Sequence, residues 1–169
     1  MSITDVFSII SDIAVVIGVV FGFHTWRKSM AIKRAEYVQG LREKFYDDKD
    51  VAEVIYNIDY GKHWYDFSFH GGSEIERKVD KTLSVCDHVC YLYGNKLISR
   101  KEFEIFKYDL YRLFHSTDVV NYLYNVYHWS KDTLKVKSSF SQLVQFGKKY
   151  LRRDFFDPKS ENYPHYLNF

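Results

Sequence analysis

The sequence has few of the residues that define specialised protein classes. Two cysteines in 169 residues exclude a disulfide scaffold, and two prolines with eight glycines exclude collagen-like and low-complexity chains. A net charge of +2 is too small to indicate duplex nucleic acid as a partner. The sequence contains no glycine-rich phosphate loop, no G-x-S-x-G elbow, no H-E-x-x-H motif and no dinucleotide fingerprint. We therefore expect no enzyme and no cofactor.

Aromatic residues are the most unusual part of the composition. Tyr, Phe and Trp make up 19% of the chain, with 15 Tyr, 14 Phe and 3 Trp. Each buried aromatic side chain removes a large apolar area from water, so a chain of this length can form a substantial core. The length predicts one folded domain.

The first 26 residues differ from the rest of the chain. Residues 13–23 are all apolar, and the longer stretch from Val6 to Trp26 would form a helix of about 31 Å, close to the ~30 Å hydrocarbon core of a bilayer. No Lys or Arg precedes this stretch, whereas four follow it within eight residues, namely Arg27, Lys28, Lys33 and Arg34. The positive-inside rule then predicts a transmembrane anchor over residues 1–26 with the N-terminus outside. We expect a single-pass protein of the cell inner membrane whose remaining residues are cytoplasmic.

One alternative is a buried core helix, because apolar runs of 10–14 residues are more often core helices than membrane spans. Asp12 favours this alternative, since a carboxylate near the bilayer centre costs about 3 kcal/mol on insertion scales. The position of the run at the start of the sequence and the basic cluster after it favour the anchor.

Small residues follow one face of the predicted anchor. Ala14, Gly18 and Gly22 are four residues apart, which is the small-xxx-small pattern that lets two membrane helices approach closely. Asp12 would need a polar partner in lipid, and a second copy of the same helix could supply one. We therefore predict that Asp12, Ala14, Gly18 and Gly22 mediate homo-oligomerisation.

Residues 27–154 are predicted to form a cytosolic helical domain. Helical periodicity continues from the anchor to Phe45, and further helices are expected to begin at caps formed by Asp50, Ser73, Ser99, Ser116 or Thr117, and Ser139. Gly61 suits the position just after the second helix, and Gly94 and Asn95 close the third. The predicted fold is therefore all-α, with a transmembrane helix that continues into a bundle of about five or six helices. Residues 155–169 are predicted to form an aromatic C-terminal tail.

Two segments are candidate ligand-binding sites. Lys62, His63 and Trp64 combine a cation, an imidazole and an aromatic face in a connector between helices. The alternative for this connector is a hydrophobic plug made by Trp64, Phe67 and Phe69, with His63 and His70 solvated at the rim. The second segment contains Lys148, Lys149, Arg152 and Arg153, which would share one side of a helix and could bind phosphate, an acidic partner or anionic lipid. A solvated basic face is the alternative there.

Cys86 and Cys90 are four residues apart on one predicted helical face. A zinc site would need two more ligands close by, and the neighbouring positions are apolar. We therefore interpret both cysteines as core thiols and predict no metal.

The stretch from Arg34 to Lys131 resembles a family of uncharacterised bacterial membrane-anchored helical proteins. The resemblance rests on these motifs: Ala35-Glu36-Tyr37, Phe45-Tyr46-Asp47-Asp48, Tyr56-x-Ile58-x-Tyr60-Gly61-Lys62, Leu92-Tyr93, Leu97-Ile98-Ser99 and Trp129. In architecture, but not in motifs, the chain is also similar to a small membrane effector of type III CRISPR systems whose cytosolic domain binds cyclic oligoadenylate. The second resemblance implies a membrane-bound role in bacterial antiviral defence, and neither resemblance transfers a site residue.

Two functions of different classes remain open from the sequence. The first is a membrane-anchored sensor or effector whose helical domain binds a nucleotide signal, such as a cyclic nucleotide, or a cytosolic protein, and thereby alters oligomerisation of the anchor. The second is a non-catalytic membrane-tethered adaptor that recruits a cytosolic partner protein.

Overall fold

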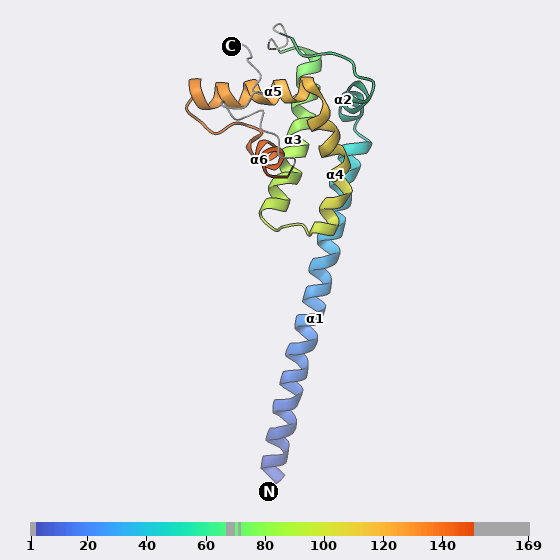
Figure 1. The fold of residues 1–169 in the computed structure, drawn as a ribbon. Coiled ribbons are helices and arrows are strands. Elements are labelled where there is room, and N and C mark those ends of the chain that lie inside the picture. The colour runs from blue at the N-terminus through green and yellow to red at the C-terminus, as the bar shows by residue number, and fades with distance from the viewer. Residues whose placement is uncertain (1–2, 67–69, 71, 151–169) are drawn as a thin grey trace. The chain divides into compact units, whose positions relative to one another are not determined.

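The computed structural model describes residues 3–66, 70 and 72–150, and all of its regular structure is helical. The prediction of an all-α fold is therefore confirmed. Six α-helices and a short π-helical turn follow one another along the chain (Figure 1). They are α1 (Ile3–Tyr46), α2 (Lys49–Asp59), α3 (Glu74–Gly94), α4 (Arg100–His115), α5 (Thr117–His128), η1 (Trp129–Thr133) and α6 (Ser141–Tyr150). The predicted tail at residues 155–169 lies outside the described residues.

The chain divides into two compact units, Met1–Gly40 and Leu41–Phe169. The first unit consists of the greater part of α1, and its large apolar side chains from Phe7 to Trp26 are each between 52% and 70% exposed where described. Within the part of the chain that the structure describes, no helix combines the length and hydropathy needed to cross a membrane. The prediction that the first helix continues to Phe45 is confirmed, because α1 ends at Tyr46.

The helix caps in the second unit mostly follow the predicted pattern. Ser99 forms a complete capping box, in which its hydroxyl accepts from the Glu102 N–H while the Glu102 carboxylate accepts from the Ser99 N–H. The hydroxyls of Ser73 and Ser116 cap α3 and α5 by accepting from the N–H groups of Glu76 and Val119. Gly61 follows α2 with φ of +60°, a left-handed conformation that favours glycine.

Two predicted caps are wrong. The N-cap of α2 is Asp48 rather than Asp50, because the Asp48 side chain accepts from the backbone N–H groups of Asp50 and Val51. The last helix does not use Ser139, because α6 begins at Ser141. The Asp87 carboxylate of α3 reaches across to it and accepts from the N–H groups of Gln142 and Leu143, each at 2.8 Å.

The core of the second unit forms around α3, which packs against α2, α4 and α6. Figure 1 shows α3 and α4 running antiparallel across a short turn, with α5 and α6 crossing α3. The interior is closely packed at one point on α6, where a Cβ at Gly147 would lie 2.6 Å from Cζ of the fully buried Phe114. The other fully buried large side chains include Leu83, Phe106, Leu110, Leu113, Leu123 and Leu143.

A polar network ties the end of α1 to α2 and α4. The carboxylate of Asp109, which is buried, accepts a 2.7 Å hydrogen bond from the Tyr46 hydroxyl and pairs with Arg112 at 3.0 Å. Arg112 also pairs with Asp59 of α2. Burial and the bond to Asp109 raise the pKa of Tyr46 to about 12. A buried carboxylate is tolerated here because it is both paired and hydrogen-bonded.

Candidate functional site

The connector between α2 and α3 is held against the start of α5 by one buried carboxylate. Asp118, which is 5% exposed, accepts from the backbone N–H groups of Trp64 at 2.6 Å and Tyr65 at 3.1 Å. Its other oxygen lies 2.7 Å from Nδ1 of His63, whose side chain is 74% exposed. Asp118 therefore fixes the position of the predicted candidates His63 and Trp64, while Lys62 lies exposed beside them.

A second set of contacts anchors the far end of the connector. The Tyr65 hydroxyl accepts from the Asn125 side-chain amide at 2.7 Å and lies 2.8 Å from Nε2 of His70. The His70 ring stacks on Tyr122, with centroids 5.4 Å apart, and its Nδ1 lies 3.5 Å from a Glu76 oxygen. The Tyr122 hydroxyl in turn donates to Asp80 of α3. The connector is thus fastened to both α3 and α5.

Burial controls the ionisation of this cluster. Burial raises the pKa of Asp80 above the usual carboxyl range, with the Tyr122 hydrogen bond partly opposing the shift. Burial together with the bond to Asp80 raises the pKa of Tyr122 well above its usual range. Burial lowers the pKa of His70, although Glu76 and Asp80 oppose that shift. His70 is therefore neutral at pH 7 and can hydrogen-bond Tyr65 through Nε2.

Phe67 and Phe69 of the plug alternative lie outside the described residues, so the structure bears only on Trp64 and the two histidines. Trp64 is half-buried and packs edge-on against Tyr65 and Tyr122, and His63 lies at the rim as that alternative expected. His70 does not, because its side chain is only 20% exposed and sits between Tyr65, Tyr122 and Glu76. Asp118 and Asn125 were not predicted, since nothing in the sequence around them indicates a partner so far away along the chain.

The basic segment places two of its four predicted residues on α6. Lys148 lies with its Nζ 4.6 Å from the centre of the Tyr127 ring, and Lys149 lies with its Nζ 5.1 Å from the Tyr150 ring. Cation–π contacts of this kind hold a lysine stem without neutralising its charge. Arg152 and Arg153 lie outside the described residues.

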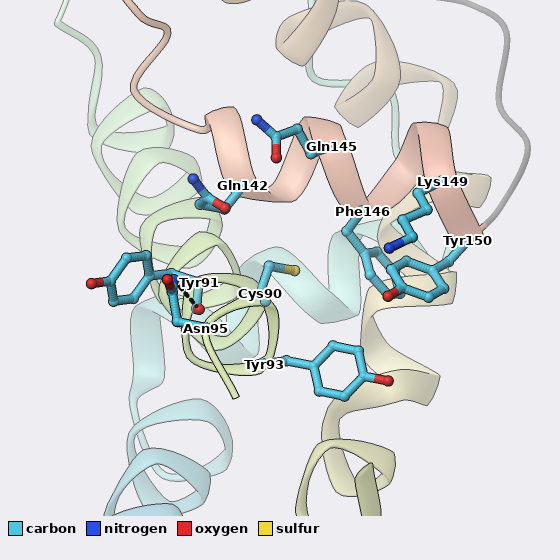
Figure 2. Close-up of a pocket in the computed structure, with 10 residues that line it drawn as sticks. Cys90, Tyr91, Tyr93, Asn95, Gln142, Gln145, Phe146, Lys149 and Tyr150 are labelled. Carbon is cyan, nitrogen blue, oxygen red and sulfur yellow. Dashed lines mark hydrogen bonds between the residues drawn. The ribbon is translucent and has the colours of Figure 1, made fainter. Parts of the chain in front are cut away.

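A pocket of about 360 Å³ opens between the C-terminal end of α3 and α6 (Figure 2). It is lined by aromatic, amide and lysine side chains with one thiol, from Cys90, Tyr91, Tyr93, Gly94, Asn95, Gln142, Gln145, Phe146, Lys149 and Tyr150. In Figure 2, Tyr93, Phe146, Tyr150 and Lys149 gather on one side, and Asn95 and Gln142 lie on the other. The volume lies at the lower end of the ~300–1,000 Å³ typical of ligand pockets.

Among the described residues, the connector and the basic segment do not meet in one pocket. The connector contacts Glu76 near the start of α3 and, through the stacking of His70 on Tyr122, is linked to Asp80, whereas the pocket begins at Cys90. At 1.5 Å per residue, the ten residues from Asp80 to Cys90 span about 15 Å of helix axis. Of the predicted ligand-binding residues that the structure describes, Lys149 lines this pocket and the others do not.

The residues predicted for oligomerisation lie on α1 in the first unit. Asp12, Ala14, Gly18 and Gly22 are all exposed. A Cβ built at Gly18 or Gly22 meets no other atom of the chain within 4 Å. Within one copy of the chain, these glycines have no packing role that a methyl group would disturb.

Both thiols lie in the core of the second unit. Cys86 and Cys90 are buried, and burial raises the pKa of each thiol above its usual range. A thiol in such surroundings is a poor nucleophile and a poor metal ligand, because both roles need the thiolate. Among the described residues, no group of His, Cys, Asp and Glu side chains is arranged to hold a metal ion.

No protein-family model matches the chain, and no curated protein and no solved structure matches it significantly. The resemblances drawn from the sequence motifs therefore stay predictions. Any functional conclusion rests on the residues and their geometry.

Proposed function

We propose that this protein is a membrane-tethered, non-catalytic sensor. Its N-terminal helix anchors the chain and self-associates, and its helical unit binds a small ligand or a protein that changes this association. A nucleotide signal is one such ligand. Resemblance in architecture adds a role in bacterial antiviral defence.

The observation that carries the anchor is the surface of α1 between Phe7 and Trp26. Its large apolar side chains are exposed on all sides of the helix rather than along one stripe. A helix that is apolar all round is stable when lipid or protein surrounds it, because water does not solvate such a surface favourably. Arg27 and Lys28 follow directly, as expected at the cytoplasmic end of a span.

Glycine substitutions in α1 test self-association. Gly18→Ala combined with Gly22→Ala adds methyl groups in open space and raises helix propensity by roughly 1 kcal/mol per site, so the helix itself should not be lost. Gly40→Ala is a matched control in the same helix, since its Cβ also meets nothing within 4 Å. We expect crosslinking in membranes to capture oligomers of the parent chain and of the control, and fewer of the double variant. Monomers in all three would refute self-association.

One observation favours a second function, in which the protein is an adaptor. Tyr56 of α2 and Tyr60, the C-cap residue of that helix, are exposed and stacked, with ring centroids 6.3 Å apart. Tyr108 of α4 is also exposed, and the guanidinium of Arg112 lies 5.3 Å from its ring. Tyrosine and arginine are enriched where proteins bind one another. Capture of one dominant partner by the parent chain, lost in Tyr60→Ala or Tyr108→Ala and insensitive to small ligands, would favour the adaptor over the sensor.

A further inference from the structure

Among the described residues that line the pocket between α3 and α6, one is a cation and none is acidic. Lys149 supplies the charge, and none of the other lining residues is Asp or Glu. Among the described residues, no carboxylate forms an ion pair with Lys149, in contrast to Lys78 and Lys81 of α3, which each contact two. An ammonium without a carboxylate partner beside a concave surface favours an anionic ligand.

The electrostatics of the pocket disfavour a ligand that carries several negative charges. It includes the C-terminal end of α3, where Gly94 and Asn95 close the helix, and that end carries the partial negative charge of the helix dipole. The carbonyl of Tyr91 also points to this end and accepts from both the backbone N–H and the side-chain amide of Asn95. One ammonium set against a negative helix end favours a single negative charge over a polyphosphate.

The aromatic side of the pocket is held in place by further stacking. The Tyr93 ring stacks on Phe103 with centroids 4.0 Å apart, and the Phe146 ring stacks on Tyr150 at 5.0 Å. Phe103 and Phe146 meet edge-on at 5.5 Å, which joins the two pairs into one cluster. Rings fixed in advance lose little entropy when a flat ligand packs against them.

The amide side of the pocket offers both donors and acceptors. Asn95 and Gln142 lie across from the aromatic cluster, and Gln145 adds a third amide. Each carboxamide can donate through its NH₂ and accept through its oxygen, so the pocket can orient polar ring substituents.

We propose that the α3–α6 pocket binds a small planar aromatic monoanion, of the aryl carboxylate class. The carboxylate pairs with Lys149, the ring packs against Tyr93 and Tyr150, and the amides bind polar substituents. This inference deepens the sensor function and rests on it for its biological meaning, but binding can be measured separately from self-association.

The experiment uses the purified full chain in detergent and three probes of similar size. These are 2-naphthoate, its neutral amide 2-naphthamide, and the saturated, non-aromatic analogue decahydro-2-naphthoate. Ligand-observed NMR titration gives their relative affinities. We expect 2-naphthoate to bind more tightly than either of the others, because it alone has both the ring and the charge. Equal binding of naphthoate and naphthamide would overturn the assignment of an anion site, and no binding of naphthoate would overturn the proposal as a whole.

Two variants locate the binding. Lys149→Gln should weaken naphthoate binding about fivefold, the effect of roughly 1 kcal/mol for a partly exposed ion pair. Lys148→Gln is the matched control, since Lys148 neighbours Lys149 on α6 but does not line the pocket.

Gly94→Leu should block the pocket, because a Cβ there meets Gln142 Oε1 only at 4.0 Å and the side chain enters the free space. Circular dichroism confirms that each variant is folded. Unchanged binding in both Lys149→Gln and Gly94→Leu would refute the location.

A separate readout distinguishes this inference from the proposed function. If naphthoate binds through Lys149 and crosslinking of α1 does not respond to it or to cyclic nucleotides, the pocket assignment stands and the sensor function fails. If crosslinking responds to a cyclic nucleotide while naphthoate does not bind, the sensor function stands and the pocket assignment fails.

Discussion

Asp87 should hold α6 on α3 through its oxygen atoms rather than through its charge. Its carboxylate accepts from the N–H groups of Gln142 and Leu143 at 2.8 Å each, as a helix N-cap would, but from another helix. Burial raises the pKa of Asp87, although the two backbone hydrogen bonds partly oppose this shift. Ionisation of Asp87 is therefore less favourable in the folded chain than in the unfolded one, and its contribution to stability decreases as the pH rises through its raised pKa.

Two substitutions separate these effects. Asp87→Ala removes the acceptor from both N–H groups and should cost about 1–2 kcal/mol of unfolding free energy, the usual loss for an N-cap. Asp87→Asn keeps an oxygen acceptor and removes the charge, so it should stay within about 0.5 kcal/mol of the parent chain at pH 7, since Asn and Asp cap equally well. As the pH falls toward 4, the parent carboxyl becomes neutral and the parent chain gains stability. The unfolding free energy of Asp87→Asn should therefore fall relative to that of the parent.

Chemical denaturation at pH 7 and pH 4 measures these differences, and hydrogen exchange at Gln142 and Leu143 locates them. We expect faster exchange at these amides in Asp87→Ala and parent-like exchange in Asp87→Asn. Equal loss of stability in both variants would show that the charge of Asp87, rather than its acceptor atoms, holds α6. No loss in either would show that the contact contributes nothing.

Three further predictions concern packing, the connector and pH. Gly147→Ala should destabilise the chain by about 1–3 kcal/mol in a thermal melt, because its Cβ would overlap the buried Phe114 ring. Adding Phe114→Leu to that variant should recover part of the loss. Additive losses from the two substitutions would contradict the overlap. Asp118→Ala should cost about 2–4 kcal/mol, because the buried N–H of Tyr65 and the partly buried N–H of Trp64 lose their acceptor. Limited proteolysis should then cut the connector faster, and an unchanged cleavage rate would contradict the role of Asp118. Asp80 has a raised pKa, so its contribution to stability is present below the ordinary carboxyl pKa of about 4 and is lost as the pH rises. Asp80→Asn should therefore gain stability relative to the parent between pH 4 and pH 7, and a constant difference would contradict the shift.

The sequence predicted those features that depend on neighbouring residues. Ser99 and Glu102 are three residues apart, so their capping box could be identified without any knowledge of tertiary structure. The position of Gly61 just after α2 was predicted for the same reason, because it follows a helix whose periodicity was visible. The continuation of the first helix to Tyr46 also followed from periodicity alone.

Long-range contacts account for what was missed. Asp87 of α3 caps α6, three helices further along the chain, and Asp118 of α5 binds a connector that precedes α3. An aspartate on a helix is expected to be solvated unless its distant partner is known. The cap of α2 failed for a local reason, since Asp48 and Asp50 are equally good caps and only the backbone conformation selects between them.

The candidate site likewise combines local features that could be predicted with long-range contacts that could not. The basic residues of α6 were visible as a cluster, but the sequence gives no reason to separate Lys149 from Lys148. The structure separates them because Lys149 faces the last turn of α3, whereas Lys148 lies over Tyr127 of α5. The aromatic side of the pocket combines Tyr93 at the end of α3 with Tyr150 at the end of α6, and no local pattern connects two positions so distant in the sequence.

The most direct test of membrane tethering is alkaline carbonate extraction of membranes from cells that express the full chain. Carbonate removes proteins held by charge or by protein partners, whereas a helix inserted in the hydrocarbon core stays until detergent dissolves the bilayer. We expect the chain to remain in the membrane pellet after carbonate and to be released by detergent. Complete release by carbonate would contradict the anchor and, with it, the proposed sensor function.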